Sequence, residues 1–264
     1  MEAKVISAGC TEFMVYALGS QSVCCSDDPH PAAAGCSLKR STGPFPSPSR
    51  SLAGGGMSSP PSDHSSYIPQ NIVLERDAKV EIVVLVLPGT SCDLNMNIRL
   101  IGEGAEANVY GAYVCGGEEK VKIAVDMHHE VAHCNSRQLF KGIAGGESKV
   151  DFYGKIIVAK DAQRTEAYQE NHNILLSDGA KVDTKPQLEI YADDVKCSHG
   201  ATIGRLNEEE QFYMRSRGIT LEDAKVLQMI SFIAPVLETI PDESQREAVA
   251  SEFELSIRNI IKNG

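Results

Sequence analysis

Two short strings in this chain carry residue types that bind metals. The first, His-Glu-Val-Ala-His at residues 129–133, matches the H-E-x-x-H signature of zinc metallohydrolases. That signature needs a helix, on which His129 and His133 reach one zinc ion and Glu130 activates water. The alternation of apolar residues over 121–127 continues through the string and predicts a strand, on which the histidines would lie roughly 13 Å apart. A zinc hydrolase therefore stays an alternative hypothesis only.

The second string is Asp-Asp-Val-Lys-Cys-Ser-His-Gly-Ala-Thr at residues 193–202. Cys197 and His199 are two residues apart, so on an extended strand both side chains project to one face, about 6 to 7 Å apart. Thiolate and imidazole are ligands for soft metals and iron–sulfur species. Because two ligands cannot close such a site, further ligands must come from elsewhere in the chain or from a partner.

The elements that would position these residues are short strands. From Asn71 onward the sequence contains alternating, β-branched runs, at residues 80–83, 97–100, 120–125 and 149–152. A turn-like phrase with small or acidic residues recurs among them, at residues 77–80, 104–107, 147–150 and 178–182. Repeated short strands and turns favour a β-helix, in which each coil packs on the next. A β-sandwich gives a similar pattern and stays open from periodicity alone.

The remaining segments differ in composition. Seven of the twelve prolines fall within residues 29–61, among Ser, Gly and Ala, so residues 1–66 are expected to be a low-order leader or extension. Residues 67–204 are expected to form the β-helix core. Asn207 and Thr220 are spaced to cap helices, which predicts a helical domain over 205–264. In the second of these helices, the face expected to pack is marked by Leu227, Ile230, Ser231 and Ala234.

Composition narrows the function classes. Acidic residues outnumber basic ones by 36 to 25, a formal charge of −11 that disfavours nucleic acid. The apolar run at 82–87 is far shorter than the ~20 residues of a membrane-spanning helix. The absence of Trp argues against the other alternative, a β-helix binding or adhesion protein with a carbohydrate-stacking groove. The eight scattered cysteines indicate a reducing compartment, the cytoplasm, or an organellar stroma if the leader is a transit peptide.

The stretch from Phe140 onward resembles the SufB/SufD family of iron–sulfur cluster assembly proteins. The resemblance is carried by long phrases in order, at residues 136–142, 152–158, 167–176, 186–202 and 211–219. Within the family, Cys-Ser-His-Gly-Ala-Thr at residues 197–202 is most similar to the SufD members. The resemblance implies a mainly β fold, a right-handed parallel β-helix followed by a small C-terminal helical domain. Family members are usually longer, so a truncated or divergent member is expected.

The resemblance also implies a function without an active site of its own. It implies a scaffold subunit of a SufBCD complex that pairs with SufB, or with a second copy of itself, and docks the ABC ATPase SufC. His199 matches a family histidine that faces a SufB cysteine, with Cys197 as its neighbour. A transient iron–sulfur cluster or iron is then expected at that interface, and none bound stably by this chain alone. The residues expected to dock SufC are Phe212, Tyr213, Arg215, Arg217, Gly218 and Leu227.

Overall fold

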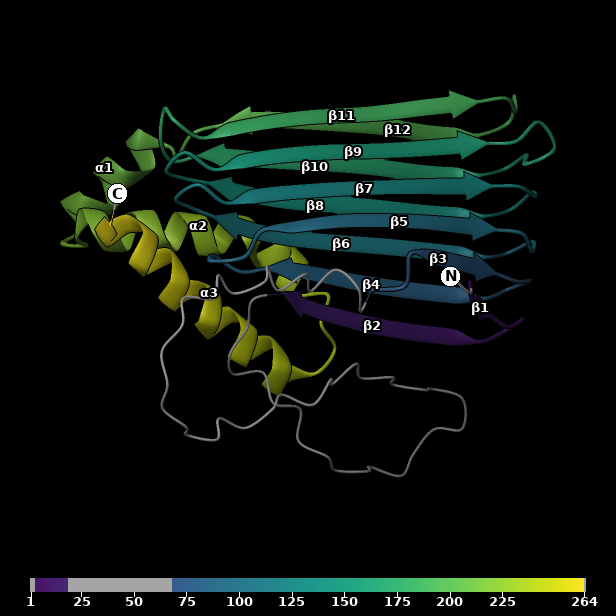
Figure 1. The fold of residues 1–264 in the computed structure, drawn as a ribbon, viewed down its shortest axis with the longest axis horizontal. Coiled ribbons are helices and arrows are strands. Elements are labelled where there is room, and N and C mark those ends of the chain that lie inside the picture. The colour runs from purple at the N-terminus through teal and green to yellow at the C-terminus, as the bar shows by residue number, and fades with distance from the viewer. Residues whose placement is uncertain (1–2, 19–67, 264) are drawn as a thin grey trace, which may run out of the picture.

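The structure of the protein is a computed structural model, which describes residues 3–18 and 68–263. Within these ranges the strands form two parallel six-stranded sheets (Figure 1). One sheet has the order β1 (Lys4–Ile6), β3 (Asn71–Leu74), β5 (Cys92–Leu100), β7 (Lys120–His129), β9 (Lys149–Val158), β11 (Lys181–Ile190). The other has the order β2 (Thr11–Leu18), β4 (Lys79–Val86), β6 (Glu106–Cys115), β8 (Asn135–Ala144), β10 (Glu166–Leu175), β12 (Lys196–Gly204).

The chain alternates between the two sheets and so advances by one coil for every two strands. This is a β-solenoid, so the predicted mainly β fold, a parallel β-helix followed by helices, is confirmed. The β-sandwich alternative is wrong, since sandwich sheets are antiparallel. The recurrent phrase falls at the turns that precede β4, β6, β9 and β11. At one of these turns Gly146 has φ +62°, a backbone conformation that favours glycine.

The alternating residues fill the space between the two sheets. In β7 the side chains of Val121, Ile123, Val125 and Met127 point inward and are buried. Large inward side chains need room on the neighbouring strand, and glycine provides it. A Cβ atom on Gly142 would lie 1.9 Å from the ring of Tyr113, which crosses the interior at that level. The inward side chains of successive coils therefore form one continuous hydrophobic core.

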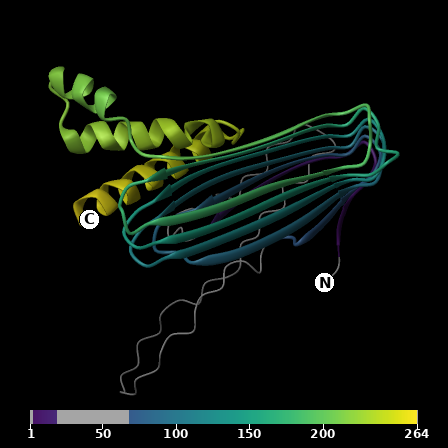
Figure 2. The ribbon, with the colours of Figure 1, turned by 90° about the horizontal axis from the view of Figure 1, so that it is seen from above.

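Three helices follow the last strand: α1 (Glu208–Ser216), α2 (Leu221–Leu237) and α3 (Glu243–Asn263). The predicted caps are confirmed, since Asn207 Oδ1 accepts from the Glu209 amide at 2.9 Å and Thr220 Oγ1 from the Asp223 amide at 3.1 Å. Helices α2 and α3 cover the outer face of the sheet that contains β4, β6 and β8 (Figures 1 and 2). The C-terminal halves of those strands are largely apolar on both faces, which explains why this part of the outer face needs a cover.

The first residues of the chain correct the expectation of a low-order leader. β1 and β2 pair in parallel with β3 and β4 and form a first coil, in which Ile6, Met14 and Leu18 are buried. The expectation is therefore wrong for Lys4–Ile6 and Thr11–Leu18. Their apolar alternation is hard to see in the sequence, because β1 is short and because Glu12, a charged residue, points inward and pairs with Lys4. Residues 19–67 lie outside the described ranges, and the division into domains stays a prediction.

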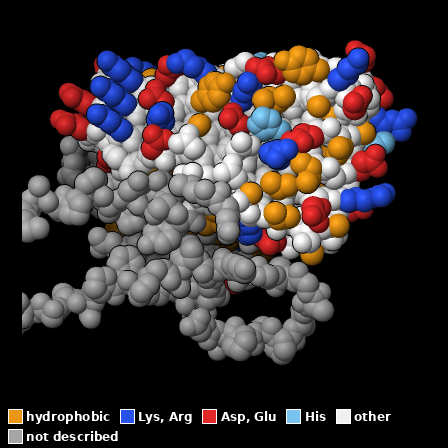
Figure 3. All heavy atoms as spheres, turned by 45° about the vertical axis from the view of Figure 1, so that its right-hand side comes forward, with side chains coloured by type: hydrophobic (Ala, Val, Ile, Leu, Met, Phe, Trp, Pro, Cys, Tyr) orange, Lys and Arg blue, Asp and Glu red, His pale blue; other side chains and the backbone are white. Residues whose placement is uncertain are grey.

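The surface carries charges of both signs. On the face in Figure 3, Lys and Arg side chains are interspersed with Asp and Glu. Several pairs are direct contacts between neighbouring positions, such as Lys155 with Glu189 at 2.8 Å and Lys185 with Asp183 at 2.7 Å. In the part of the chain that the structure describes, no helix is long and apolar enough to cross a membrane.

Candidate functional site

The solenoid ends in an open coil formed by β11 and β12. Each of these strands is the last of its sheet, so each has only one neighbour among the described strands (Figure 1). The coil is therefore uncovered, and Ile190, Tyr191 and Ile203 are exposed there. An exposed edge of a parallel sheet leaves backbone amides and carbonyls unpaired, which makes it suited to contact with another chain.

Cys197 and His199 lie on this last strand. They are in register with Ala167 and Gln169 of β10, which point into the solenoid and are buried. Cys197 and His199 share that parity, so both side chains are directed into the open end, where Cys197 is half-buried and His199 is exposed. Burial raises the pKa of the Cys197 thiol above its usual value, so the free chain carries it protonated at neutral pH. Their role as ligands stays a prediction.

Buried polar side chains lie directly beneath this end. Gln169 donates from Nε2 to Oε1 of Gln138 at 2.8 Å, and both side chains are fully buried. On the same strand, Asn173 bonds to Asn171 and to the hydroxyl of Tyr113. These buried polar residues were not predicted from the sequence. The signal was present, because Gln169, Asn171 and Asn173 alternate within one strand at the parity that carries apolar residues in the earlier coils.

The H-E-x-x-H string does not form a zinc site, so the zinc hydrolase alternative is wrong. Strand β7 ends at His129 and the next residues form a bend, with no helix there. His129 is buried with Nε2 2.8 Å from Ser136 Oγ, and burial lowers the pKa of His129 to about 4. Glu130 pairs with Arg99 at 2.6 Å, while His133 is exposed with φ +61°. Among the described residues no group of three His, Cys, Asp or Glu could hold a metal ion.

The residues expected to dock an ATPase lie on α1, on α2 and on the turn between them. The Phe212, Tyr213 and Leu227 side chains are 74%, 60% and 48% exposed. Arg215 and Arg217 are also exposed, with the guanidinium of Arg217 5.3 Å from the centre of the Tyr213 ring. Gly218, with φ +89°, ends the turn after α1. We call these six residues the α1–α2 face: Phe212, Tyr213, Arg215, Arg217, Gly218 and Leu227.

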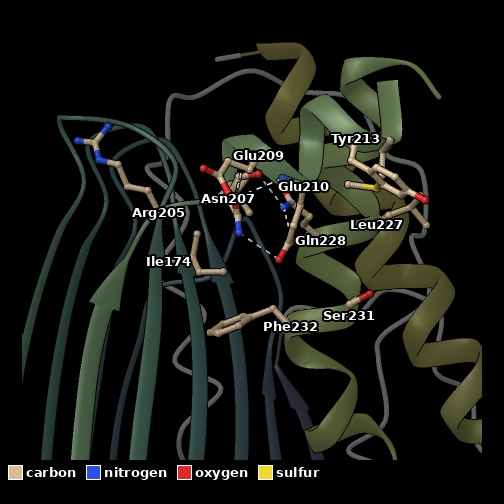
Figure 4. Close-up of a pocket in the computed structure, with 12 residues that line it drawn as sticks. Ile174, Arg205, Asn207, Glu209, Glu210, Tyr213, Leu227, Gln228, Ser231 and Phe232 are labelled. Carbon is tan, nitrogen blue, oxygen red and sulfur yellow. Dashed lines mark hydrogen bonds between the residues drawn. The ribbon is translucent and has the colours of Figure 1, made fainter. Parts of the chain in front are cut away.

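A pocket of about 670 Å³ adjoins this face, between the end of β10, the 205–207 linker, α1 and α2 (Figure 4). Its apolar lining comes from Ile174, Leu206, Tyr213, Met214, Leu227 and Phe232. Polar contacts fix one wall, because Gln228 Nε2 donates to Glu210 Oε2 at 2.8 Å and to the Asn207 carbonyl at 3.0 Å (Figure 4). The pocket therefore suits an apolar side chain of a partner that enters between the strands and the helices.

Comparisons with known proteins agree with these features. Residues 61–232 match the family described as "SUF system FeS cluster assembly, SufBD core domain". The chain is 38% identical to the iron–sulfur cluster assembly protein SufD of Escherichia coli (strain K12) over 194 residues, 74% of this chain and 45% of that protein. It is 34% identical to the chloroplastic protein ABCI7 of Arabidopsis thaliana over 178 residues, 66% of this chain and 37% of that protein. The chain thus spans less than half the length of these two relatives.

Proposed function

This chain belongs to the SufBD family of iron–sulfur cluster assembly proteins, and from that premise we propose that it is a SufD-like scaffold subunit of a SufBCD-type complex, without an enzyme activity of its own. The observation that carries the proposal is the place of Cys197 and His199 at the open end of the solenoid. In this proposal the chain works in the cytoplasm, or in an organellar stroma as the chloroplastic relative suggests.

The cluster, or its iron, is cargo that this chain shares with a partner. The donor set fits that cargo, since a thiol and an imidazole share one face and His199 is accessible. Two ligands cannot hold a cluster alone, so a SufB-like subunit, or a second copy of this chain, supplies the rest. Burial raises the pKa of the Cys197 thiol, and coordination to the iron would lower it again, because a coordinated thiol is deprotonated.

The ATPase acts from the helical side. A SufC-like ABC ATPase docks on the α1–α2 face, where exposed aromatic and aliphatic side chains lie beside two arginines. Only three residues, Arg205, Leu206 and Asn207, separate the end of β12 from the start of α1. A displacement of α1 by the ATPase therefore acts directly on the strand that carries Cys197 and His199.

The test is His199→Ala in the complex reconstituted with SufB-like and SufC-like subunits. The variant is expected to keep the fold, because the side chain is exposed. Loss of a ligand should lower the cluster yield at least about tenfold, measured by ultraviolet–visible absorption after anaerobic reconstitution. His172→Ala is the matched control, since His172 lies on the neighbouring strand and contacts Thr202 from the outer face. A wild-type yield from His199→Ala would end the proposal.

A further inference from the structure

A buried amide whose oxygen has no hydrogen-bond partner among the described residues lies next to His199. Gln169 is 0% exposed, and its Nε2 donates to Gln138 Oε1 at 2.8 Å. Its Oε1 is buried and has no hydrogen-bond partner among the described residues. A Cβ atom on Gly154 of the opposite sheet would lie 2.0 Å from Gln169 Nε2, so the amide occupies a slot that only glycine leaves open. The position of this amide is thus determined by the fold.

The direction of the unused oxygen follows from the order of the strands. Strand β10 lies between β8, which carries Gln138, and β12. Because Oε1 and Nε2 diverge from the planar amide carbon, an Nε2 that bonds to Gln138 on β8 leaves Oε1 directed away from β8, on the side of β10 where β12 lies. The residue of β12 in register with Gln169 is His199, which has the same inward parity. Neighbouring strands are about 4.8 Å apart, within reach of a hydrogen bond between side chains.

We propose that Gln169 is a positioning residue for His199, and that Gln169 Oε1 accepts a hydrogen bond from one imidazole N–H. His199 is exposed and has no hydrogen bond or ion pair with another described residue, so its ring is free to rotate into this contact. A buried acceptor without a partner is costly, which favours the bond. The ring then has one nitrogen held by the scaffold and the other, a lone-pair donor, directed out of the open end.

The bond is independent of any bound cluster, but its use in presenting a ligand rests on the proposed function. Orientation by a second hydrogen bond is how proteins fix the tautomer of a histidine that binds a metal. The amide column His199–Gln169–Gln138 would do so from the interior of this chain alone. The partner subunit then meets an imidazole that is already oriented.

The test follows the ring N–H protons of His199 by NMR in the full-length chain labelled with 15N-histidine, with the signal assigned by its loss in His199→Asn. At neutral pH one N–H signal of His199 should persist, whereas the N–H of a free exposed imidazole exchanges with water too fast to be seen. Gln169→Met, which keeps the shape and removes the acceptor, should make exchange at least about tenfold faster. Gln169→Glu should keep the signal, because the carboxylate retains an acceptor for His199. Gln138 Nε2, which has no partner in the wild-type structure, can donate to the other carboxylate oxygen.

Asn171→Leu is the matched control, because it removes a buried amide from the same strand in register with Ala201 instead of His199. It should leave the His199 signal in place. No persistent His199 signal in the wild-type chain would overturn the proposal, whether or not the variants fold, and so would an unchanged signal in Gln169→Met. If the signal behaves as expected while His199→Ala retains full cluster yield, the positioning role stands and the proposed function fails.

Discussion

Burial determines the protonation of His129, the first histidine of the H-E-x-x-H string. His129 lies in the interior with one ring nitrogen bonded to Ser136, and burial lowers its pKa to about 4 from 6.5. Between pH 6.5 and pH 4, His129 therefore binds a proton in the unfolded chain but not in the folded chain. The contribution of His129 to the free energy of unfolding is therefore fully present above pH 6.5. It is lost as the pH decreases toward 4, which lowers that free energy by up to about 3 kcal/mol.

The prediction is checked by urea unfolding at pH 7, 5.5 and 4.5 for the wild type and for His129→Gln, which cannot gain this proton. The difference in free energy of unfolding between the two chains should shift in favour of His129→Gln as the pH decreases. Taking the difference removes the contribution of carboxylates such as Glu106, whose lowered pKa also weakens the fold in acid. Parallel pH curves for the two chains would show that His129 does not contribute.

Residue types and spacing made Cys197 and His199 candidate ligands, but they did not point to the amide beneath them. A polar residue within a strand is ordinary when it faces solvent, and the sequence alone does not show which parity faces inward. That Gln169 is internal, and that it is the neighbour of His199, depends on the register of β10 with β12. This register joins residues 30 positions apart and is set by the length of a coil, which the degenerate repeat did not define.

At the scale of elements, the strands were easier to predict than the faces of the helices. From Asn71 onward, strand positions followed from period two, whereas β1 and β2 were not predicted. The face of α2 expected to pack was wrong for Leu227 and Ser231, which are exposed, although Ile230 does pack against the apolar cluster. The fully buried residues of α2 include Val226, Met229 and Ile233. Helix α2 packs on the sheet and on α3 together and is apolar around most of its circumference, so its sequence marks no single face.

Because α2 packs through other residues than Leu227, the α1–α2 face is left available for a partner. The double variant Phe212→Ala, Leu227→Ala removes exposed apolar area, so its free energy of unfolding should stay within about 0.5 kcal/mol of the wild type. Its affinity for the SufC-like ATPase should fall about tenfold or more, measured by calorimetry. Leu255→Ala, at a position on α3 whose exposure of 63% lies between those of Phe212 and Leu227, should not change the affinity. Docking elsewhere would be indicated if the double variant bound normally.

On the scale of the whole molecule, the solenoid has two ends that are finished differently. At the end of the chain's last coil, β11 and β12 leave the interior open at Cys197 and His199. At the other end, the terminal strands β1 and β2 bury their own inward residues Ile6, Met14 and Leu18, so the interior is closed there. Stacked repeats need such terminal cover, since each coil buries its core only against its neighbours. The contrast favours the open end as the one made for a partner.

Removal of residues 1–67 should therefore destabilise the solenoid at the end opposite to the candidate site. The truncated chain loses the burial of Ile6, Met14 and Leu18 and exposes the residues beneath them, which should lower the free energy of unfolding by at least about 3 kcal/mol. The newly exposed edge of β4 should also promote self-association, seen by size-exclusion chromatography. Deletion of residues 24–60 alone keeps β1 and β2 and serves as the control. If both deletions unfold at the wild-type urea concentration, β1 and β2 do not stabilise the solenoid, and its first stable coil begins at β3.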